Sequence, residues 1–345
     1  MQYTSLGNTG LYVSRLCLGA MTFGEGGNRF SQMIGATGQE LADRMVDTAF
    51  EAGINFFDTA NMYSDGESEI MLGKAIGDRR RDAVIATKLY NTSKTGVNDM
   101  GTSRLSVMRE VEDSLRRLGT DYIDLYQVHN WDDTTPIEET LKALDDLVRQ
   151  GKVRYIGLSN FAAWQIAKAD GLAKQLGTER FISAQQYYSL VGRELEREVL
   201  PACIDLGIGT MIWSPLAGGF LSGKFSAGGD GEGRRKVFEF PPVHPTRGDE
   251  IVAVLKEIAA ELNSTPAQVA LAWLLTRPGV SSVIIGARKE EQLVDNIASI
   301  DLTLSEDQLK RLDEVSALAP EYPGWFPKGE RGVDRVKALK EMLDK

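Results

Sequence analysis

The residues best suited to chemistry occur where short apolar segments of the chain end. Asp58 follows the apolar residues of NFFDTA, and Tyr63 comes five residues later. Lys88 lies in AVIATKL, and His129 ends DLYQVH. A carboxylate, a phenol, an amine and an imidazole that lie together can transfer a proton and stabilise a negatively charged oxygen. These four positions are therefore the first candidates for a catalytic site.

Their chemistry suits the reduction of a carbonyl group. When a hydride adds to the carbonyl carbon, the oxygen becomes an alkoxide that needs a proton. A tyrosine hydroxyl, with an ordinary pKa of about 10, delivers that proton poorly unless a neighbouring cation favours its ionised form. Lys88 would supply this cation for Tyr63, and Asp58 would keep Lys88 charged. His129 would hydrogen-bond the carbonyl oxygen and orient it.

Each of these residues also has an ordinary structural explanation. Asp58 could be a turn or helix-capping residue, and Lys88 could extend to solvent. His129 could be a satisfied core histidine, and Tyr63 could be a surface aromatic. Such explanations become harder to sustain if all four lie on one rim, because buried charges need partners.

The pattern of strands and helices predicts that one rim does collect them. After a hairpin formed by 2–6 and 11–14 with a turn at 7–10, eight apolar strands alternate with amphipathic helices. The strands are expected at 15–20, 55–60, 83–89, 124–129, 155–160, 182–188, 209–215 and 282–287. The helices are expected at 39–52, 67–77, 103–118, 136–150, 162–176, 193–206, 248–276 and 289–299.

This alternation predicts a (β/α)8 TIM barrel that forms a single domain over residues 1–345. A doubly wound sheet is disfavoured because no G-x-G-x-x-G follows any strand. The long loops 24–38 and 225–247 are expected at the C-terminal face of the barrel, where chemistry occurs in this fold. A third linker-like stretch covers 319–332.

Composition excludes several classes of protein. The chain has 345 residues, of which 42% are hydrophobic, and a formal net charge of −10, which makes nucleic acid an unexpected partner. No apolar run approaches the length of a membrane span of about 18 residues. Residues 1–16 lack a basic leader and an apolar core, so we expect no signal peptide and a cytoplasmic protein. Cys17 and Cys203 are expected to be free thiols, and no metal-ligand spacing is present.

One motif is misleading. Residues 218–224 (GGFLSGK) fit the phosphate-binding pattern G-x-x-x-x-G-K. The next residue is Phe225, where this loop needs Ser or Thr to hold Mg²⁺. We therefore reject a nucleoside triphosphatase.

Seven segments resemble, in order and over almost the whole chain, those of the aldo-keto reductase superfamily. They are GINFFDTANMYSDGESEIMLG, VIATKLY, DYIDLYQVHNWD, GKVRYIGLSNF, AQQYYSL, WSPLAGGFLSGKF and VIIGARKEEQLVDN. The last two are most similar to the branch of aryl-alcohol dehydrogenase-like and potassium-channel β-subunit-like proteins. The resemblance implies a catalytic tetrad with Tyr63 as the proton donor, consisting of Asp58, Tyr63, Lys88 and His129.

The resemblance also implies NADPH (NADP⁺) as the cofactor, bound without a Rossmann fold. Ser159, Asn160 and Gln185 would bind the nicotinamide carboxamide, and Trp213 would stack on the ring. Arg288 would pair with the 2′-phosphate, which favours NADPH over NADH, unless it is a solvated surface residue. The other expected cofactor contacts are Met21, Asp58, Ser214, Pro215, Leu216, Gly218, Lys224, Arg234, Gly286, Gln292 and Asn296.

Aromatic and apolar residues of the loops are expected to form the wall of a substrate pocket. The candidates are Phe23, Met62, Tyr90, Trp131 and Trp325, with Phe326 beside the last. Such a wall favours an apolar carbonyl compound, aromatic and polycyclic ones included, although loop packing could explain each residue singly.

The expected function is therefore a reversible, NADPH-dependent reduction of an aldehyde or ketone to an alcohol. The alternative is an NADPH-sensing, β-subunit-like binding protein that regulates a partner. A barrel lyase or isomerase that uses no NADP is a weaker third possibility, because it leaves Trp213 and the IGAR segment unexplained. The expected partner is a small carbonyl compound, and the sequence leaves both a monomer and a homo-oligomer open.

Overall fold

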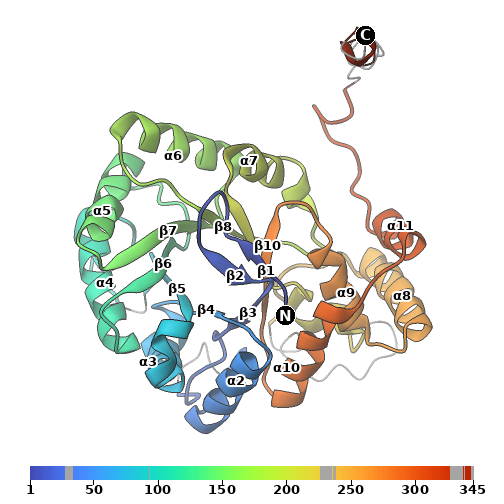
Figure 1. The fold of residues 1–345 in the computed structure, drawn as a ribbon, viewed down its shortest axis with the longest axis horizontal. Coiled ribbons are helices and arrows are strands. Elements are labelled where there is room, and N and C mark those ends of the chain that lie inside the picture. Colours follow the sequence, from blue (N-terminus) through green and yellow to red (C-terminus); the bar gives the residue numbers. More distant parts are fainter. Residues whose placement is uncertain are drawn as a thin grey trace.

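Eight parallel strands close into a barrel in the order β10-β3-β4-β5-β6-β7-β8-β9 (Figure 1). The computed structural model describes residues 1–27, 34–92, 94–225, 235, 238–326, 337 and 339–342. The barrel strands are β3 (Leu16–Gly19), β4 (Phe56–Asp58), β5 (Val84–Leu89), β6 (Ile123–Val128), β7 (Val153–Ser159), β8 (Ser183–Tyr187), β9 (Gly209–Trp213) and β10 (Val280–Ile285). The predicted TIM barrel is confirmed.

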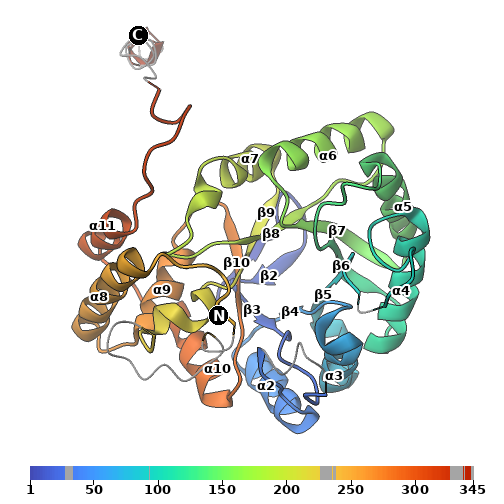
Figure 2. The same ribbon diagram turned by 180° about the vertical axis from the view of Figure 1, so that it is seen from behind.

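Helices surround the barrel in both views (Figures 1 and 2). They are α2 (Gln39–Glu51), α3 (Glu67–Ile76), α4 (Arg104–Leu118), α5 (Ile137–Arg149), α6 (Ala163–Leu176), α7 (Val199–Leu206), α8 (Pro245–Glu261), α9 (Pro266–Leu275), α10 (Glu290–Ile297) and α11 (Glu306–Val315). Short 3-10 helices are η1 (Tyr63–Gly66), η2 (Gly77–Asp82), η3 (Glu194–Glu196), η4 (Ala217–Ser222) and η6 (Ala298–Asp301). Among the described helices, none has both the length and the apolarity needed to cross a membrane.

The structure differs from the predicted helices in the C-terminal part of the chain. The single helix expected at 248–276 is two helices, because Pro266 begins α9 and Thr265 caps it by accepting a hydrogen bond from the Gln268 N–H. Proline disfavours the helical conformation of the residue that precedes it, so the helix is interrupted there. Helix α11 was not predicted, although Ser305 and Gln308 form a capping box at its start.

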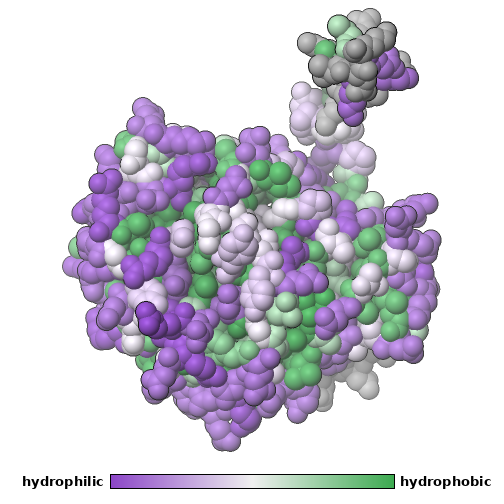
Figure 3. All heavy atoms as spheres, in the orientation of Figure 1, coloured by the Kyte–Doolittle hydropathy of each residue, from purple (hydrophilic) through white to green (hydrophobic). Residues whose placement is uncertain are grey.

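The predicted hairpin is confirmed as β1 (Tyr3–Ser5) paired antiparallel with β2 (Tyr12–Ser14). It crosses the end of the barrel at which the strands begin (Figure 1), where Leu6 and Val13 are fully buried against interior residues. Gly7 has a φ of +62°, and a Cβ there would lie 2.5 Å from the carbonyl oxygen of Ile182. This close contact between the hairpin and the barrel backbone closes this end of the barrel. Figure 3 views the molecule in this orientation, with hydrophilic side chains over most of the periphery.

Alternation along the strands separates two apolar layers. Phe56, Ala86 and Leu125 belong to the cluster inside the barrel, whereas a larger cluster fills the space between strands and helices. Because side chains alternate between the faces of a strand, the residues two positions further along also point inward. Asp58 and Lys88 therefore lie in the layer above the apolar interior, at the C-terminal end of the barrel.

Candidate active site

Asp58 and Lys88 form a buried ion pair at the C-terminal ends of neighbouring strands. Nζ of Lys88 lies 2.7 Å from Oδ2 of Asp58 and also donates to the carbonyl oxygen of Thr59 at 2.7 Å. The Lys88 side chain is fully buried, and that of Asp58 is 5% exposed. A buried charge is tolerated when it is paired in this way, so the predicted partnership of the two residues is present.

The electrostatics of the pair keep Lys88 protonated. Burial by itself lowers the pKa of Lys88, because it disfavours the charged form. The charge of Asp58 and the interaction with Tyr63 act in the opposite direction, and the net effect raises the pKa above its ordinary value. Lys88 is thus a cation throughout the neutral pH range.

Tyr63 lies beside this cation at the start of η1. Nζ of Lys88 is 5.1 Å from the centroid of the Tyr63 ring, and the two side chains share a hydrogen bond. The next residues, Ser64 and Asp65, have left-handed φ values of 48° and 57°. Such conformations are unfavourable for residues other than glycine and cluster at functional sites.

His129 lies immediately after β6, and its ring meets the Tyr63 ring edge-on at a centroid distance of 6.0 Å. Burial, together with the positive charge of Lys88, lowers the pKa of His129 to about 3. The imidazole is therefore neutral at pH 7. Within the described part of the chain, its Nδ1 atom has no hydrogen-bond partner.

Gln127 is a site residue that the sequence reasoning missed. Its Nε2 donates to Oδ1 of Asp58 at 3.2 Å, and Nε2 of Gln185 donates to the same oxygen at 2.7 Å. Gln127 is two residues before His129, so strand alternation places both on the inner face. An amide side chain on the inward-facing side of β6, in register with the apolar Leu125, was the signal that could have identified it.

The ends of β7 and β9 offer groups that fit an amide ligand. Oγ of Ser159 is buried and has no partner among the described residues. Asn160 has a left-handed φ of 58°, donates to the carbonyl oxygen of His129 at 3.0 Å, and accepts from Nε1 of Trp213 at 3.1 Å. Hydroxyl and amide groups such as these can pair with the donors and acceptors of a carboxamide. Gln185 is also at this rim, with its amide nitrogen already engaged by Asp58.

Trp213 contacts two aromatic rings. Its ring is 5.0 Å from that of Tyr187 and 5.7 Å from that of Phe240, which is nearly parallel at 10°. Arg235 holds this region together by donating to the carbonyl oxygens of Ala217 and Pro241 at 3.1 and 2.7 Å. The predicted cofactor contact Arg234 lies outside the described residues, and Arg235 and Phe240 were not among the predicted contacts.

The residues expected to hold the phosphates and adenosine follow β9 and β10, in the adjoining loops, in η4 and in α10. Oγ of Ser214 accepts from the Gly218 N–H at 3.1 Å, and Lys224 and Arg288 are exposed. The Arg288 N–H donates to Oε1 of Gln292 at 3.1 Å, and Asn296 donates to the carbonyl oxygen of Gly286. Pro215 is buried, whereas Met21 and Leu216 are half-buried.

The expected substrate-pocket residues do not all come together. Tyr90 and Met62 are half-buried at the ends of β5 and β4. Phe23 is fully buried in the layer between strands and helices and has no surface to offer a substrate. Trp131 packs edge-on against Phe161 and Trp164.

Trp325 lies in the tail that leaves the barrel after α11 (Figures 1 and 2), where its ring contacts Tyr322 and Phe326. The Trp325 residue is 57% exposed. The described part of the tail up to Phe326 therefore forms no wall of the barrel mouth, because it points away from the strands. Among the described residues, no three His, Cys, Asp or Glu side chains gather as a metal site would need.

Comparison with known proteins gives a consistent relationship over the whole barrel. The model of the aldo/keto reductase family matches residues 15–317. The chain is 41% identical over 341 residues to the uncharacterised oxidoreductase YrpG of Bacillus subtilis, covering 96% of this chain and 98% of the relative. It is 37% identical to a probable voltage-gated potassium channel subunit beta of Oryza sativa, covering 100% and 98%. A putative aryl-alcohol dehydrogenase of Schizosaccharomyces pombe is 36% identical, with coverage of 92% and 96%.

Proposed function

The chain belongs to the aldo/keto reductase family, and on this premise we propose that it reduces an aldehyde or ketone to an alcohol with NADPH. Oxidoreductase chemistry on carbonyl groups is what the family and the relatives support at the general level. The observation that carries the finer proposal is the buried contact of Lys88 with Asp58 and Tyr63.

The three N–H donors of Lys88 explain how Tyr63 would act as the acid. Two of them are directed to Asp58 and the Thr59 carbonyl oxygen, and the third interaction is with Tyr63. A cation at this distance stabilises the phenolate that forms when the proton leaves. Tyr63 would then give its proton to the carbonyl oxygen of the substrate as negative charge develops there.

His129 would orient the substrate as a neutral hydrogen-bond donor. Its lowered pKa, about 3, keeps the ring uncharged during turnover. An uncharged imidazole can donate to the carbonyl oxygen without competing with Tyr63 for the role of acid. The edge-on packing of the two rings is compatible with both acting on one oxygen atom.

When bound, the reduced nicotinamide supplies the hydride. Ser159, Asn160 and Gln185 would hold its carboxamide, and Trp213 would present a face to the ring. The exposed guanidinium of Arg288 is the group best suited to a 2′-phosphate, and it is the basis for proposing NADPH rather than NADH. A single domain and a cytoplasmic location stay predictions from the sequence.

The test is the loss of reduced-nicotinamide absorbance with the purified chain and a panel of aromatic and polycyclic carbonyl compounds. NADPH and NADH are run in parallel, with Tyr63→Phe as the control. We expect turnover with NADPH that the control abolishes. Tight NADPH binding without turnover on any carbonyl would contradict the proposal and favour the regulatory role suggested by the channel-subunit relative.

A further inference from the structure

Two threonines point outward from the barrel beside the candidate catalytic pair. Thr59 follows Asp58 and Thr87 precedes Lys88, and neighbouring residues of a strand face opposite sides. Oγ1 of Thr59 lies 2.7 Å from Oγ of Ser68, and Oγ1 of Thr87 donates to Oε1 of Glu69 at 2.6 Å. The first turn of α3 thus holds β4 and β5 from outside.

Glu69 is a fully buried carboxylate with an arginine partner. Nε of Arg117, from the end of α4, lies 2.5 Å from Oε2 of Glu69. The same arginine side chain supports the turn that follows Tyr63, because a Cβ added to Gly66 would lie 2.6 Å from Cδ of Arg117. The ion pair of Glu69 and Arg117 therefore contacts both strand β5, which carries Lys88, and the turn that follows Tyr63.

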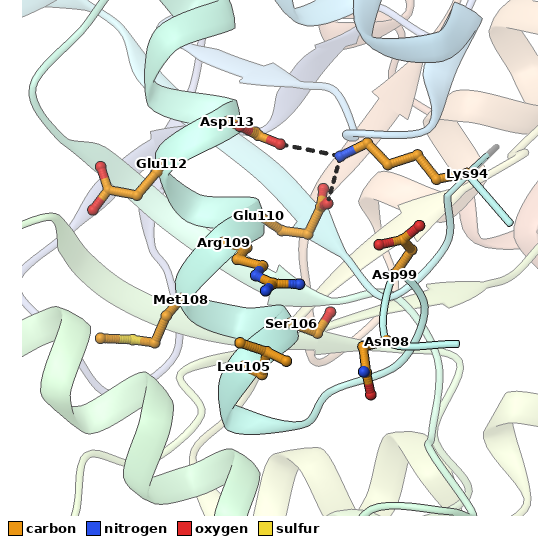
Figure 4. Close-up of a pocket in the computed structure, with 10 residues that line it drawn as sticks. All are labelled: Lys94, Asn98, Asp99, Leu105, Ser106, Met108, Arg109, Glu110, Glu112 and Asp113. Atoms are coloured by element: carbon orange, nitrogen blue, oxygen red, sulfur yellow. Dashed lines mark hydrogen bonds and ion pairs between the residues drawn. The ribbon is translucent and has the colours of Figure 1, made fainter. Parts of the chain in front are cut away.

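Glu110 extends this cluster to a third segment of the site. Its Oε2 accepts from Nδ2 of Asn61 at 2.8 Å, and the backbone N–H of Asn61 donates to the carbonyl oxygen of Lys88 at 3.2 Å. Lys94 closes the cluster at the surface by pairing with Glu110 at 3.4 Å and with Asp113 at 3.1 Å (Figure 4). Asn61 lies between Asp58 and Tyr63 in the chain, so its anchor constrains both.

We propose that Glu69 and Arg117 are positioning residues that set the contact between Tyr63 and Lys88 from outside the barrel. Neither is placed to touch substrate or cofactor, since both lie between α3, α4 and the strands. The proposal rests on the proposed carbonyl reduction. Its physical basis is that proton transfer requires a precise donor geometry, and a misplacement of about 1 Å can cost on the order of 100-fold in rate.

The opposite end of β5 provides a matched control. There Oδ2 of Asp124 accepts from the Ile85 N–H at 2.9 Å and pairs with Nη2 of Arg80 at 2.8 Å. Glu69 and Asp124 are thus both carboxylates that accept a hydrogen bond from β5 and pair with an arginine. They differ in the end of the strand that they hold, because Ile85 is near its start and Thr87 is next to Lys88.

The first experiment compares Glu69→Gln with Asp124→Asn in the full-length protein. We expect Glu69→Gln to lower kcat by about 10- to 100-fold, with the Kd for NADPH within about twofold. Asp124→Asn should lose comparable thermal stability and keep kcat within about twofold. Equal losses of kcat in the two variants would overturn the proposal, because they would show a general structural effect.

A milder pair of variants covers the case in which Glu69→Gln does not fold. Thr87→Val removes the hydroxyl that donates to Glu69 and keeps the shape, whereas Thr87→Ser keeps the hydroxyl. We expect kcat to fall about tenfold in Thr87→Val and to be largely restored in Thr87→Ser. No difference between these two variants would also overturn the proposal.

A measurement without turnover separates this proposal from the proposed function. Tyrosine labelled with ¹³C at Cζ reports the pH at which Tyr63 ionises, with Tyr63→Phe to assign the signal. In Glu69→Gln this pH should rise by about one unit, because Lys88 no longer stabilises the phenolate as well, while Asp124→Asn leaves it unchanged. An inactive wild type that still shows this difference would refute the carbonyl reduction alone, and an unchanged titration in Glu69→Gln would refute the positioning role.

Discussion

At the end of the barrel where the strands begin, a hairpin fills the opening with apolar side chains. Leu6 and Val13 are fully buried there. Gly7 contacts the backbone at the starts of strands β8 and β9. At the other end, the layer above the apolar interior contains a buried lysine, its carboxylate partner and polar atoms such as Oγ of Ser159 that lack partners among the described residues. The hairpin end is the closed end of the barrel, and the other end, which holds the buried ion pair, is the open end.

Backbone conformation shows the same difference. Among the described residues, those other than glycine with a positive φ are Ser64, Asp65, Tyr90, Asn160, Ser214, Ala217 and Asn263. All except Asn263 lie in loops that follow strands β4, β5, β7 and β9. Strain of this kind costs on the order of 1–3 kcal/mol per residue and is retained where it directs side chains. Among the described residues, backbone strain is therefore concentrated at the open end of the barrel.

Removal of the Tyr63 hydroxyl should give the largest effect and should be confined to the open end. We expect Tyr63→Phe to lower kcat by about 10³-fold, because only the proton donor is lost, with little change in melting temperature or NADPH affinity. Tyr12→Phe, at an exposed position of the hairpin, is the control and should retain full activity. Steady-state kinetics with any accepted carbonyl would decide this, and a near-normal rate in Tyr63→Phe would remove the role assigned to it.

A substitution at the closed end should do the reverse. Gly7→Ala should destabilise the fold by about 2–4 kcal/mol, since the added Cβ meets backbone atoms and the φ is positive. The kcat of the molecules that remain folded should not change. Gly10→Ala is the matched control, because a Cβ there meets nothing within 4 Å. Denaturant unfolding checks the prediction, and similar stabilities for the two variants would contradict the tight closure.

The half-buried histidine of the open end, His129, should make stability depend on pH. The pKa of His129 is lowered to about 3 in the folded state. In the unfolded chain, the same imidazole has its ordinary pKa of about 6.5. The unfolded state therefore binds more protons between these values, and stability falls as pH decreases from about 6.5 toward 3. Relative to His129→Gln, wild type should lose about 2 kcal/mol between pH 7 and pH 5. Parallel urea titrations at the two pH values test this, and identical losses would show that the pKa of His129 is not lowered in the folded state.

The smallest effect is expected at the exposed edge of the open end. Arg288→Ala should raise the Kd for NADPH by about tenfold, as loss of one charge-assisted contact predicts, and leave the Kd for NADH nearly unchanged. Lys289→Ala, the adjacent exposed cation, is the control. Fluorescence titration with both cofactors would show the difference. A parallel loss of affinity for both would mean that Arg288 does not contact a 2′-phosphate.

The sequence by itself determined the architecture and the identity of the polar residues at the strand ends. The alternation of apolar strands with amphipathic helices is a local signal, and it is sufficient to predict a barrel whose rim collects Asp58, Lys88 and His129. At Thr265 and Pro266, the local capping signal conflicted with the helical periodicity of residues 248–276. The proline begins a new helix there, so the prediction of one long helix was wrong.

Only the tertiary structure decided which side chains support the rim. Glu69 and Arg117 are 48 residues apart in the chain, and no spacing in the sequence links them. The stacking of Phe240 on Trp213 and the position of Phe23 in the outer layer were equally invisible. Periodicity fixes which face a residue occupies, but a hydrogen bond or a ring contact depends on how separate segments pack, and that packing is set by the whole fold.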